Sequence, residues 1–257
     1  MADITTVTFD LWQTLLVDER DLGQARAEVR LEGAKSALDK FGKKFGLEHI
    51  REAYMSCFQQ CRDVRNGGLD VDFREQVSIF VNHIEPGLAE QLTPGVMDEV
   101  AAFYSDSFLT HPPPAHSDAV QVLQGIKDMG LKMGLISNTG MTPGFTFRSY
   151  MAERGMLDYF HTLTFSDEVK LAKPGREIFM MTLRAMDATP QQTIHVGDHV
   201  LNDVVGAKRC GLKTIWITGF YKREDPDDAE TEPDITVSGL GEVVEAVAKL
   251  AGLVAPD

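Results

Sequence analysis

Positive charge is scarce in this chain. Its 257 residues include 25 Lys and Arg against 39 Asp and Glu, which gives a net charge of −14 at neutral pH. An acidic chain of this kind is repelled at long range by nucleic acid and by anionic membrane surfaces. We therefore expect no nucleic acid and no membrane as partners.

Cysteine and long apolar stretches are equally scarce. Cys57, Cys61 and Cys210 are too few and too scattered for a disulfide framework, and we assign them no function. No run approaches the roughly 18 apolar residues of a membrane span, and no basic segment precedes an apolar one at the N-terminus. The composition, 43% hydrophobic and 25% charged, is that of a globular protein. We expect a cytoplasmic protein, a monomer or homodimer, with a small-molecule substrate.

Short apolar runs alternate with helical patterns, mainly in the C-terminal half. The runs are rich in β-branched residues and predict strands at 4–9, 131–136, 161–165, 193–196 and 213–217. The helical patterns occupy 118–129, 144–155, 175–187, 202–210 and 239–251. Alternation at this spacing predicts an α/β fold, in which helices cover both faces of a mostly parallel sheet. Ligands of such sheets bind beyond the carboxyl ends of the strands.

The segment from about 22 to 109 differs, because it has helical periodicity, many charges and no convincing strand. It predicts a separate helical unit inserted after the first strand. Three prolines after His111 mark its exit, since no helix continues through them. We expect a core domain of residues 1–17 and 112–257, and a helical domain of residues 18–111.

Polar side chains stand where the predicted strands end. Asp10 directly follows the first strand, Ser137 follows the second, and Asp198 follows the fourth. Asp203 comes five residues later, and Lys173 is held in front of a proline. Each has an ordinary explanation by itself, as a turn cap or a solvated charge. Together they predict a site of hard oxygen ligands suited to Mg²⁺, with a carboxylate that can act as a nucleophile.

In this order the motifs strongly resemble those of the haloacid dehalogenase-like hydrolase superfamily. The matching stretches, within about residues 4–220, are Phe9-Asp10-Leu11-Trp12-Gln13-Thr14-Leu15, Leu135-Ile136-Ser137-Asn138-Thr139, Lys173-Pro174 and Val196-Gly197-Asp198 with Asp203. The resemblance implies a Rossmann-like core, with the helical domain as a mobile cap.

The resemblance also implies roles for individual residues. Asp10 would be the nucleophile that forms a covalent aspartyl intermediate, and Ser137 and Lys173 would bind the transferred group. Mg²⁺ would be held by Asp10, Asp198, Asp203 and the main-chain carbonyl of Trp12. The expected substrate contacts are Trp12, Thr14, Asn138, Thr139 and Arg26. Cations at this position would offset the repulsion between a phosphate dianion and the Asp10 carboxylate.

One position departs from the pattern of the family's phosphatases. They usually carry a second Asp two residues after the nucleophile, which protonates the leaving alcohol and then activates water. Here that residue is Trp12, and an indole exchanges no proton near neutral pH. The acid–base contribution, typically about 10²–10⁴-fold, must come from elsewhere or be missing. His199 and an acid of the helical domain are candidate replacements.

Trp12 leaves a second function open. The family's 2-haloacid dehalogenases also place an aromatic residue there, because halide leaves without protonation and no metal is used. Asp10 would then displace halide, while Arg20, Arg26 or Arg30 holds the substrate carboxylate.

The fourth motif favours a phosphatase over a dehalogenase. Such dehalogenases carry Ser where this chain has Asp198. A carboxylate there without a metal would repel an anionic haloacid. We therefore expect a Mg²⁺-dependent phosphatase of a small phosphorylated metabolite. The alternatives are a dehalogenase, or a binding protein that lost catalysis along with the second Asp.

Overall fold

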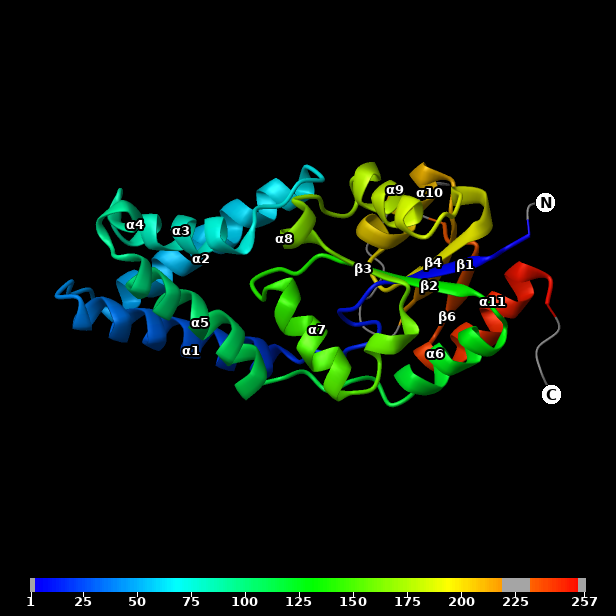
Figure 1. The fold of residues 1–257 in the computed structure, drawn as a ribbon, viewed down its shortest axis with the longest axis horizontal. Helices are drawn as coiled ribbons and strands as arrows, with labels where there is room; N and C mark the ends of the chain where they lie inside the picture. The colour runs from blue at the N-terminus through cyan, green and yellow to red at the C-terminus, as the bar shows by residue number, and fades with distance from the viewer. Residues whose placement is uncertain (1–2, 219–231, 254–257) are drawn as a thin grey trace.

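A six-stranded parallel sheet forms the core of the protein (Figure 1). The structure, a computed structural model, describes residues 3–218 and 232–253. The strand order is β3-β2-β1-β4-β5-β6. The strands are β1 (Thr6–Phe9), β2 (Lys132–Ser137), β3 (Thr162–Phe165), β4 (Thr193–Gly197), β5 (Lys213–Ile217) and β6 (Ile235–Val237). The predicted α/β fold is confirmed.

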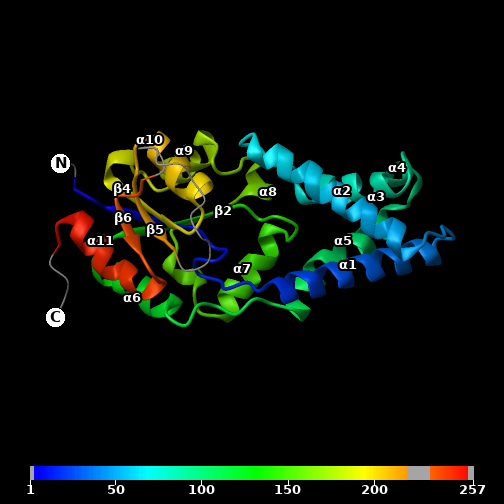
Figure 2. The same ribbon diagram turned by 180° about the vertical axis from the view of Figure 1, so that it is seen from behind.

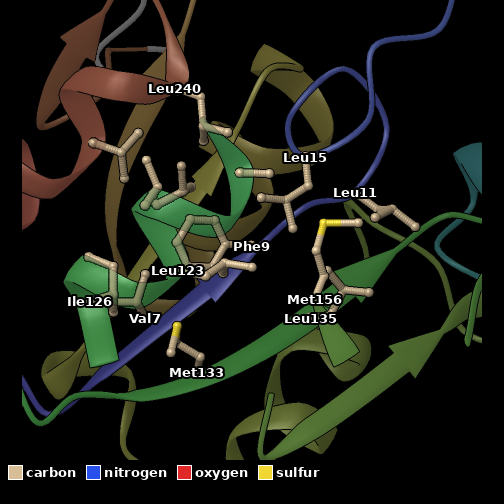
Figure 3. Close-up of a cluster of buried hydrophobic side chains, with 14 of the residues drawn as sticks. Val7, Phe9, Leu11, Leu15, Leu123, Ile126, Met133, Leu135, Met156 and Leu240 are labelled. Atoms are coloured by element: carbon tan, nitrogen blue, oxygen red, sulfur yellow. The ribbon is translucent and has the colours of Figure 1, made fainter. Parts of the chain in front are cut away.

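Helices cover both faces of the sheet. One face packs against α6 (Ala119–Asp128), α7 (Gly144–Glu153) and α11 (Val243–Ala251). Val7 and Phe9 of β1 point into this layer (Figure 3). The other face packs against α9 (Arg176–Ala185) and α10 (Gly206–Cys210) through a second cluster that includes Ile136. Because both faces are covered, β1 is buried along its whole length, as its apolar and β-branched sequence predicts.

The elements differ from the predicted ones mainly at their ends. β1 begins at Thr6, two residues later than predicted, and β2 extends to Ser137. The helix predicted at 202–210 is a π-helical turn, Val200–Val205, that leads into α10. The short elements that the sequence did not reveal are β6, α8 (Ser166–Val169) and the 3₁₀ turns Leu157–Tyr159 and Pro190–Gln192. The helix predicted at 239–251 begins with a 3₁₀ turn, Leu240–Glu242, that leads into α11.

Of the six helices that lie between β1 and β2 in the chain, the first five form a separate body beside the sheet (Figures 1 and 2). They are α1 (Arg20–Lys40), α2 (Leu47–Asn66), α3 (Phe73–Ile84), α4 (Leu88–Gln91) and α5 (Pro94–Thr110). We call residues 20–110 the helical region. It has its own hydrophobic cluster, in which Leu31, Phe80 and Tyr104 are fully buried. None of the helices that the structure describes has both the length and the apolar character needed to cross a membrane.

The two connections between the helical region and the sheet run side by side. The Val17 amide donates to the Pro114 carbonyl at 2.9 Å, and Leu16 forms an antiparallel bridge with Ala115. The guanidinium of Arg26 fastens this junction, because it donates to the Asp18 carboxylate at 2.5 Å and to the His111 carbonyl at 3.0 Å.

Candidate active site

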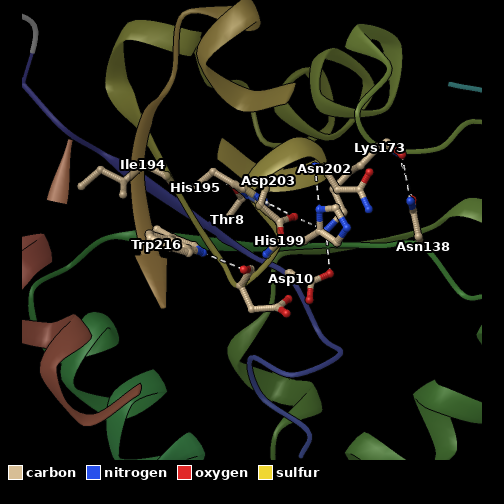
Figure 4. A network of polar contacts seen from close by, with 11 residues as sticks. Thr8, Asp10, Asn138, Lys173, Ile194, His195, His199, Asn202, Asp203 and Trp216 are labelled. Carbon is tan, nitrogen blue, oxygen red and sulfur yellow. Dashed lines mark hydrogen bonds and ion pairs between the residues drawn. The ribbon is translucent and has the colours of Figure 1, made fainter. Parts of the chain in front are cut away.

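Three carboxylates and one ammonium group converge at the carboxyl edge of the sheet (Figure 4). Asp10 follows the central strand β1, Asp198 follows its neighbour β4, and Asp203 comes from the turn before α10. One oxygen of each of the three carboxylates lies within 4.8 Å of the others. The Lys173 Nζ donates to Asp10 Oδ1 at 2.6 Å and to Asp203 Oδ1 at 2.7 Å. All four side chains are buried.

A glycine makes room for this cluster. A Cβ atom at Gly197, the last residue of β4, would lie 2.4 Å from the carboxyl carbon of Asp203. The absence of a side chain therefore lets the Asp203 carboxylate approach the strand end, where its Oδ2 accepts a hydrogen bond from the His199 amide at 2.9 Å.

Burial and mutual repulsion shift the proton affinities of these acids. Burial raises the pKa of Asp10 to about 6 although Lys173 opposes the shift. Burial, together with the charges of Asp10 and Asp203, raises the pKa of Asp198 to about 9. Burial alone would also raise the pKa of Asp203, but Lys173 and His195 hold it below its usual range.

This charge balance fits a divalent cation. One ammonium group stands against three carboxylates, so the cluster has an excess of negative charge when all three acids are ionised, and this excess contributes to the raised pKa of Asp198. The donor atoms are carboxylate oxygens, the hard ligands that Mg²⁺ prefers. The residues present therefore suit the metal that the motifs imply.

Trp12 occupies the position where the family's phosphatases carry their second acid. Its half-buried ring packs edge-on against Phe108 and Phe147, with centroid distances of 6.1 and 5.3 Å. The Arg26 guanidinium carbon lies 5.6 Å from the ring centroid. Trp12 also lines the cavity of about 140 Å³ that contains Asp10 and Lys173. The residue both fills the junction with the helical region and forms a wall of the site.

Two hydroxyl groups near the ends of β1 and β2 are buried without partners. The hydroxyls of Thr14 and Ser137 form no hydrogen bond with any residue that the structure describes. A buried hydroxyl without a partner costs free energy, so binding of a ligand that accepts a hydrogen bond from it is favoured. Thr139 differs, because its amide and hydroxyl both contact Ser166 Oγ, at 2.9 and 3.2 Å.

Asn138 positions Lys173 through the main chain. Its side-chain amide donates to the Lys173 carbonyl at 2.8 Å and accepts from the Lys173 amide at 2.9 Å. This pair of hydrogen bonds fixes the segment from which the buried ammonium reaches Asp10. Asn138 also lines the cavity beside Asp10.

The structure adds one residue that the sequence argument missed. His195 lies in the middle of β4, its Nε2 donating to Asp203 Oδ1 at 3.1 Å and its Nδ1 accepting from the Thr8 hydroxyl at 2.9 Å. Burial lowers its pKa, so the ring is neutral in this network. A histidine inside an otherwise apolar strand was the signal that was available. His199, by contrast, is exposed at the edge of the same cavity.

The arginines proposed for a substrate carboxylate are placed differently from one another. Arg20 is exposed at the first position of α1. Arg26 is buried at the junction with its two partners there. Arg30 is buried and donates to Ser107, Tyr54 and Thr142. A substrate role for Arg26 remains a prediction. The side chains of Arg26 and Arg30 already form hydrogen bonds with groups of the protein itself.

A further buried acid, Asp167, lies behind the loop that carries Thr139. Its Oδ2 accepts from the Gly144 amide at 3.0 Å, while its Oδ1 has no hydrogen-bond partner among the described residues. Burial, with a smaller contribution from Glu168, raises the pKa of Asp167 to about 6. The folded protein therefore keeps this proton at pH values at which the unfolded chain releases it.

We expect the stability of Asp167→Asn, relative to the wild type, to increase as the pH rises. The stability that protonated Asp167 provides is present below about pH 4 and is lost as the pH rises through about 6. The neutral amide has no such loss. Between pH 5 and pH 8 the free energy of unfolding of the variant should gain about 1–2 kcal/mol relative to the wild type. Urea denaturation at both pH values measures this, and an equal difference at both would contradict it.

Comparison with known proteins agrees with the motifs. The sequence model of a hydrolase family, the haloacid dehalogenase-like hydrolases, matches residues 4–211. A glyceraldehyde 3-phosphate phosphatase of Methanocaldococcus jannaschii is 27% identical over 250 residues, which are 96% of this chain and 98% of the relative. A second such phosphatase, from Methanopyrus kandleri, is 27% identical over 59% of this chain and 64% of its own. A phosphoserine phosphatase of Thermus thermophilus is 31% identical over 52% of each chain.

Solved structures share the fold. A phosphatase of the same superfamily from Thermococcus onnurineus superposes with a TM-score of 0.64 at 21% identity, covering 95% of this chain and 98% of its own. A 2-haloacid dehalogenase from Pseudomonas syringae gives a TM-score of 0.70 at 22% identity, covering 96% and 99%. At such identities the likeness concerns the fold, and it does not separate the two chemistries.

Proposed function

Because the chain belongs to the haloacid dehalogenase-like hydrolase family, we propose that it is a Mg²⁺-dependent phosphatase of a small phosphorylated metabolite. The observation that carries the proposal is the set of three carboxylate oxygens within 4.8 Å of one another, with the Lys173 ammonium 2.6 Å from Asp10. A site for carbon–halogen cleavage needs one carboxylate, whereas this site gathers three. The curated relatives named above are phosphatases, which supports the same conclusion.

Asp10 is the nucleophile of the proposed reaction. One of its oxygens forms a bond to phosphorus while the bond between phosphorus and the alcohol oxygen breaks, which leaves an aspartyl-phosphate. Water then attacks phosphorus, releases inorganic phosphate and restores the carboxylate. Since Trp12 carries no exchangeable proton at neutral pH, the departing alkoxide takes its proton from solvent or from another side chain.

The groups around Asp10 compensate the negative charge of the bound phosphate. The Lys173 ammonium, fixed by Asn138, offsets the negative charge that the phosphate brings to Asp10. The unpartnered Ser137 hydroxyl is available to donate to a phosphoryl oxygen. Asp10, Asp198, Asp203 and the Trp12 carbonyl would hold Mg²⁺, which when bound supplies positive charge against the phosphate oxygens.

We propose that residues 18–111 act as a cap domain over this site. A cavity of about 500 Å³ lies between the core and α2, a size that suits a small metabolite. It shares Trp12, Asn138 and Lys173 with the smaller cavity around Asp10. The reacting phosphate would occupy the smaller space and the rest of the substrate the larger one.

Trp12 favours one second candidate, a 2-haloacid dehalogenase. An aromatic wall beside the nucleophile suits a reaction in which the leaving group needs no proton. The two candidates differ in their product and in their need for a metal, so one assay separates them.

We expect phosphate release from p-nitrophenyl phosphate, glyceraldehyde 3-phosphate or phosphoserine in the presence of Mg²⁺. Removal of the metal with EDTA should lower the rate at least about 100-fold, because the charge excess at Asp10 is then uncompensated. Restoring Mg²⁺ should restore the rate. Halide release from 2-chloropropionate that persists in EDTA, without phosphate release from any ester, would instead establish the dehalogenase.

A further inference from the structure

The larger cavity has two walls of different character. Its core side includes Trp12, Asn138 and Lys173, and its opposite side is formed by Phe58, Arg62, Arg65 and Asn66 of α2. The α2 residues recur at helical spacing and so present one face of the helix to the site. This face is therefore placed to contact the part of a substrate that lies beyond its reacting phosphate.

Arg62 is the cation of this wall that has no ion pair within the described part of the chain. Arg65 is buried and pairs with Asp70 at 3.2 Å, and Lys173 pairs with Asp10 and Asp203. Arg62 is exposed to the cavity and forms no ion pair or hydrogen bond through its side chain with any residue in 3–218 or 232–253.

Two acids that share the cavity or the helix with Arg62 interact with other residues. Asp18, the acid of the same cavity outside the carboxylate cluster, pairs with Arg26. Asp63, the next residue in α2, accepts from Gln59 and lines a different groove of the helix surface. A protein of net charge −14 repels anions at long range. A guanidinium without an ion-pair partner attracts an anion locally in spite of this repulsion.

We propose that the substrate carries a second anionic group, a carboxylate or a second phosphate, and that the Arg62 guanidinium binds it in the cavity beneath α2. The inference rests on the proposed phosphatase function and narrows its substrate class. Guanidinium groups match carboxylate and phosphate oxygens in geometry and form charge-assisted hydrogen bonds with both. The side-chain amide of Asn66, which hydrogen-bonds to no described residue, is beside it to bind a hydroxyl or the same anion.

This assignment differs from the one that the sequence suggested. Arg26 and Arg30 each have two or more hydrogen-bond partners inside the protein, so a substrate would have to compete with them. Arg62 has no such competitor within the described chain. A substrate anion would be its first partner.

The test compares substrates that differ only in the second charge. One pair is 3-phosphoglycerate and glycerol 3-phosphate, and the other is fructose 1,6-bisphosphate and fructose 6-phosphate. For at least one pair the wild-type enzyme with Mg²⁺ should prefer the doubly anionic member in kcat/KM by about tenfold or more. Arg62→Gln should remove most of that preference, leaving the two members of the pair within about threefold of each other, mainly through KM, as expected for loss of a charged hydrogen bond that forms on binding. The pair that responds identifies the anion.

Two further variants make the result specific. Arg62→Lys keeps the charge but loses the planar fork, so it should retain part of the preference. Arg74→Gln removes the same charge from the exposed surface of α3, outside the cavity, and should change the preference by less than about twofold. A wild type without preference in either pair, or a preference that Arg62→Gln leaves intact, overturns the inference while hydrolysis of p-nitrophenyl phosphate continues. Failure of the proposed function would instead abolish phosphate release from every ester.

Discussion

Asp10→Asn should lower the turnover of phosphate esters by about 10⁴-fold or more, because the amide oxygen cannot form the covalent intermediate. The substitution keeps the shape of the side chain and leaves an oxygen that accepts from Lys173. Burial raises the pKa of Asp10 to about 6, so its carboxylate, although mostly ionised at neutral pH, costs the fold free energy relative to the unfolded chain. The variant should therefore unfold at the same temperature as the wild type or at a higher one, and lost activity would not reflect lost structure.

The measurement is phosphate release in Mg²⁺ together with the mass of the acid-quenched protein. The wild type should gain the mass of one phosphoryl group on the peptide that contains Asp10, and the variant should not. Asp158→Asn, on an exposed turn that lines neither cavity, is a matched control whose rate should stay within about twofold. A variant that keeps a tenth of the wild-type rate would show that Asp10 is not the nucleophile.

The position of the acid cluster could be predicted because one rule of sheet architecture fixes it. Asp10 and Asp198 each follow an apolar strand, and the carboxyl ends of adjacent parallel strands meet at one edge. Register then brings the two acids together, since Phe9 pairs with Val196. The sequence pattern was sufficient to predict this meeting of Asp10 and Asp198, because it depends only on where the strands end and how their backbones pair.

The polar network behind the cluster could not be predicted by the same rule. His195 belongs to a strand whose pattern is apolar, and its partner Thr8 is 187 residues away. The pattern shows that such a position is buried, but not which polar group in another strand satisfies it. The sequence also pointed to Arg26 and Arg30 as substrate contacts, whereas the structure favours Arg62, and the cause is related. Helical periodicity shows that Arg26 and Arg30 share a face with each other, whereas the direction of that face depends on how α1 packs against α5.

Trp12→Asp should raise the steady-state hydrolysis of alkyl phosphates such as glycerol 3-phosphate by about 10²-fold or more. The new carboxylate would stand two residues after the nucleophile, at the wall of the cavity that contains Asp10. There it could protonate the departing alkoxide and then activate water, a contribution that typically reaches about 10²–10⁴-fold. The gain should be smaller for p-nitrophenyl phosphate, whose leaving group departs without a proton.

The kinetics of the wild type should show the effect of having no general base at position 12. If no group activates water, the aspartyl-phosphate forms faster than it breaks down, and p-nitrophenol appears in a burst followed by a slow steady rate. In Trp12→Asp the burst should shrink because breakdown of the intermediate no longer limits turnover. A burst that is unchanged in the variant would contradict a role for this position in the second step.

Packing must be separated from chemistry in this experiment, because Trp12 contacts Phe108, Phe147 and Arg26. Loss of the half-buried indole should destabilise the fold by about 1–3 kcal/mol, which thermal unfolding will reveal. Trp12→Phe is the matched control, since it keeps an aromatic ring at the junction but offers no proton. Its rate should stay within about threefold of the wild type. If folded Trp12→Asp is no faster than wild type, the proton already comes from another group, and exposed His199 at the edge of the cavity is the residue to replace next.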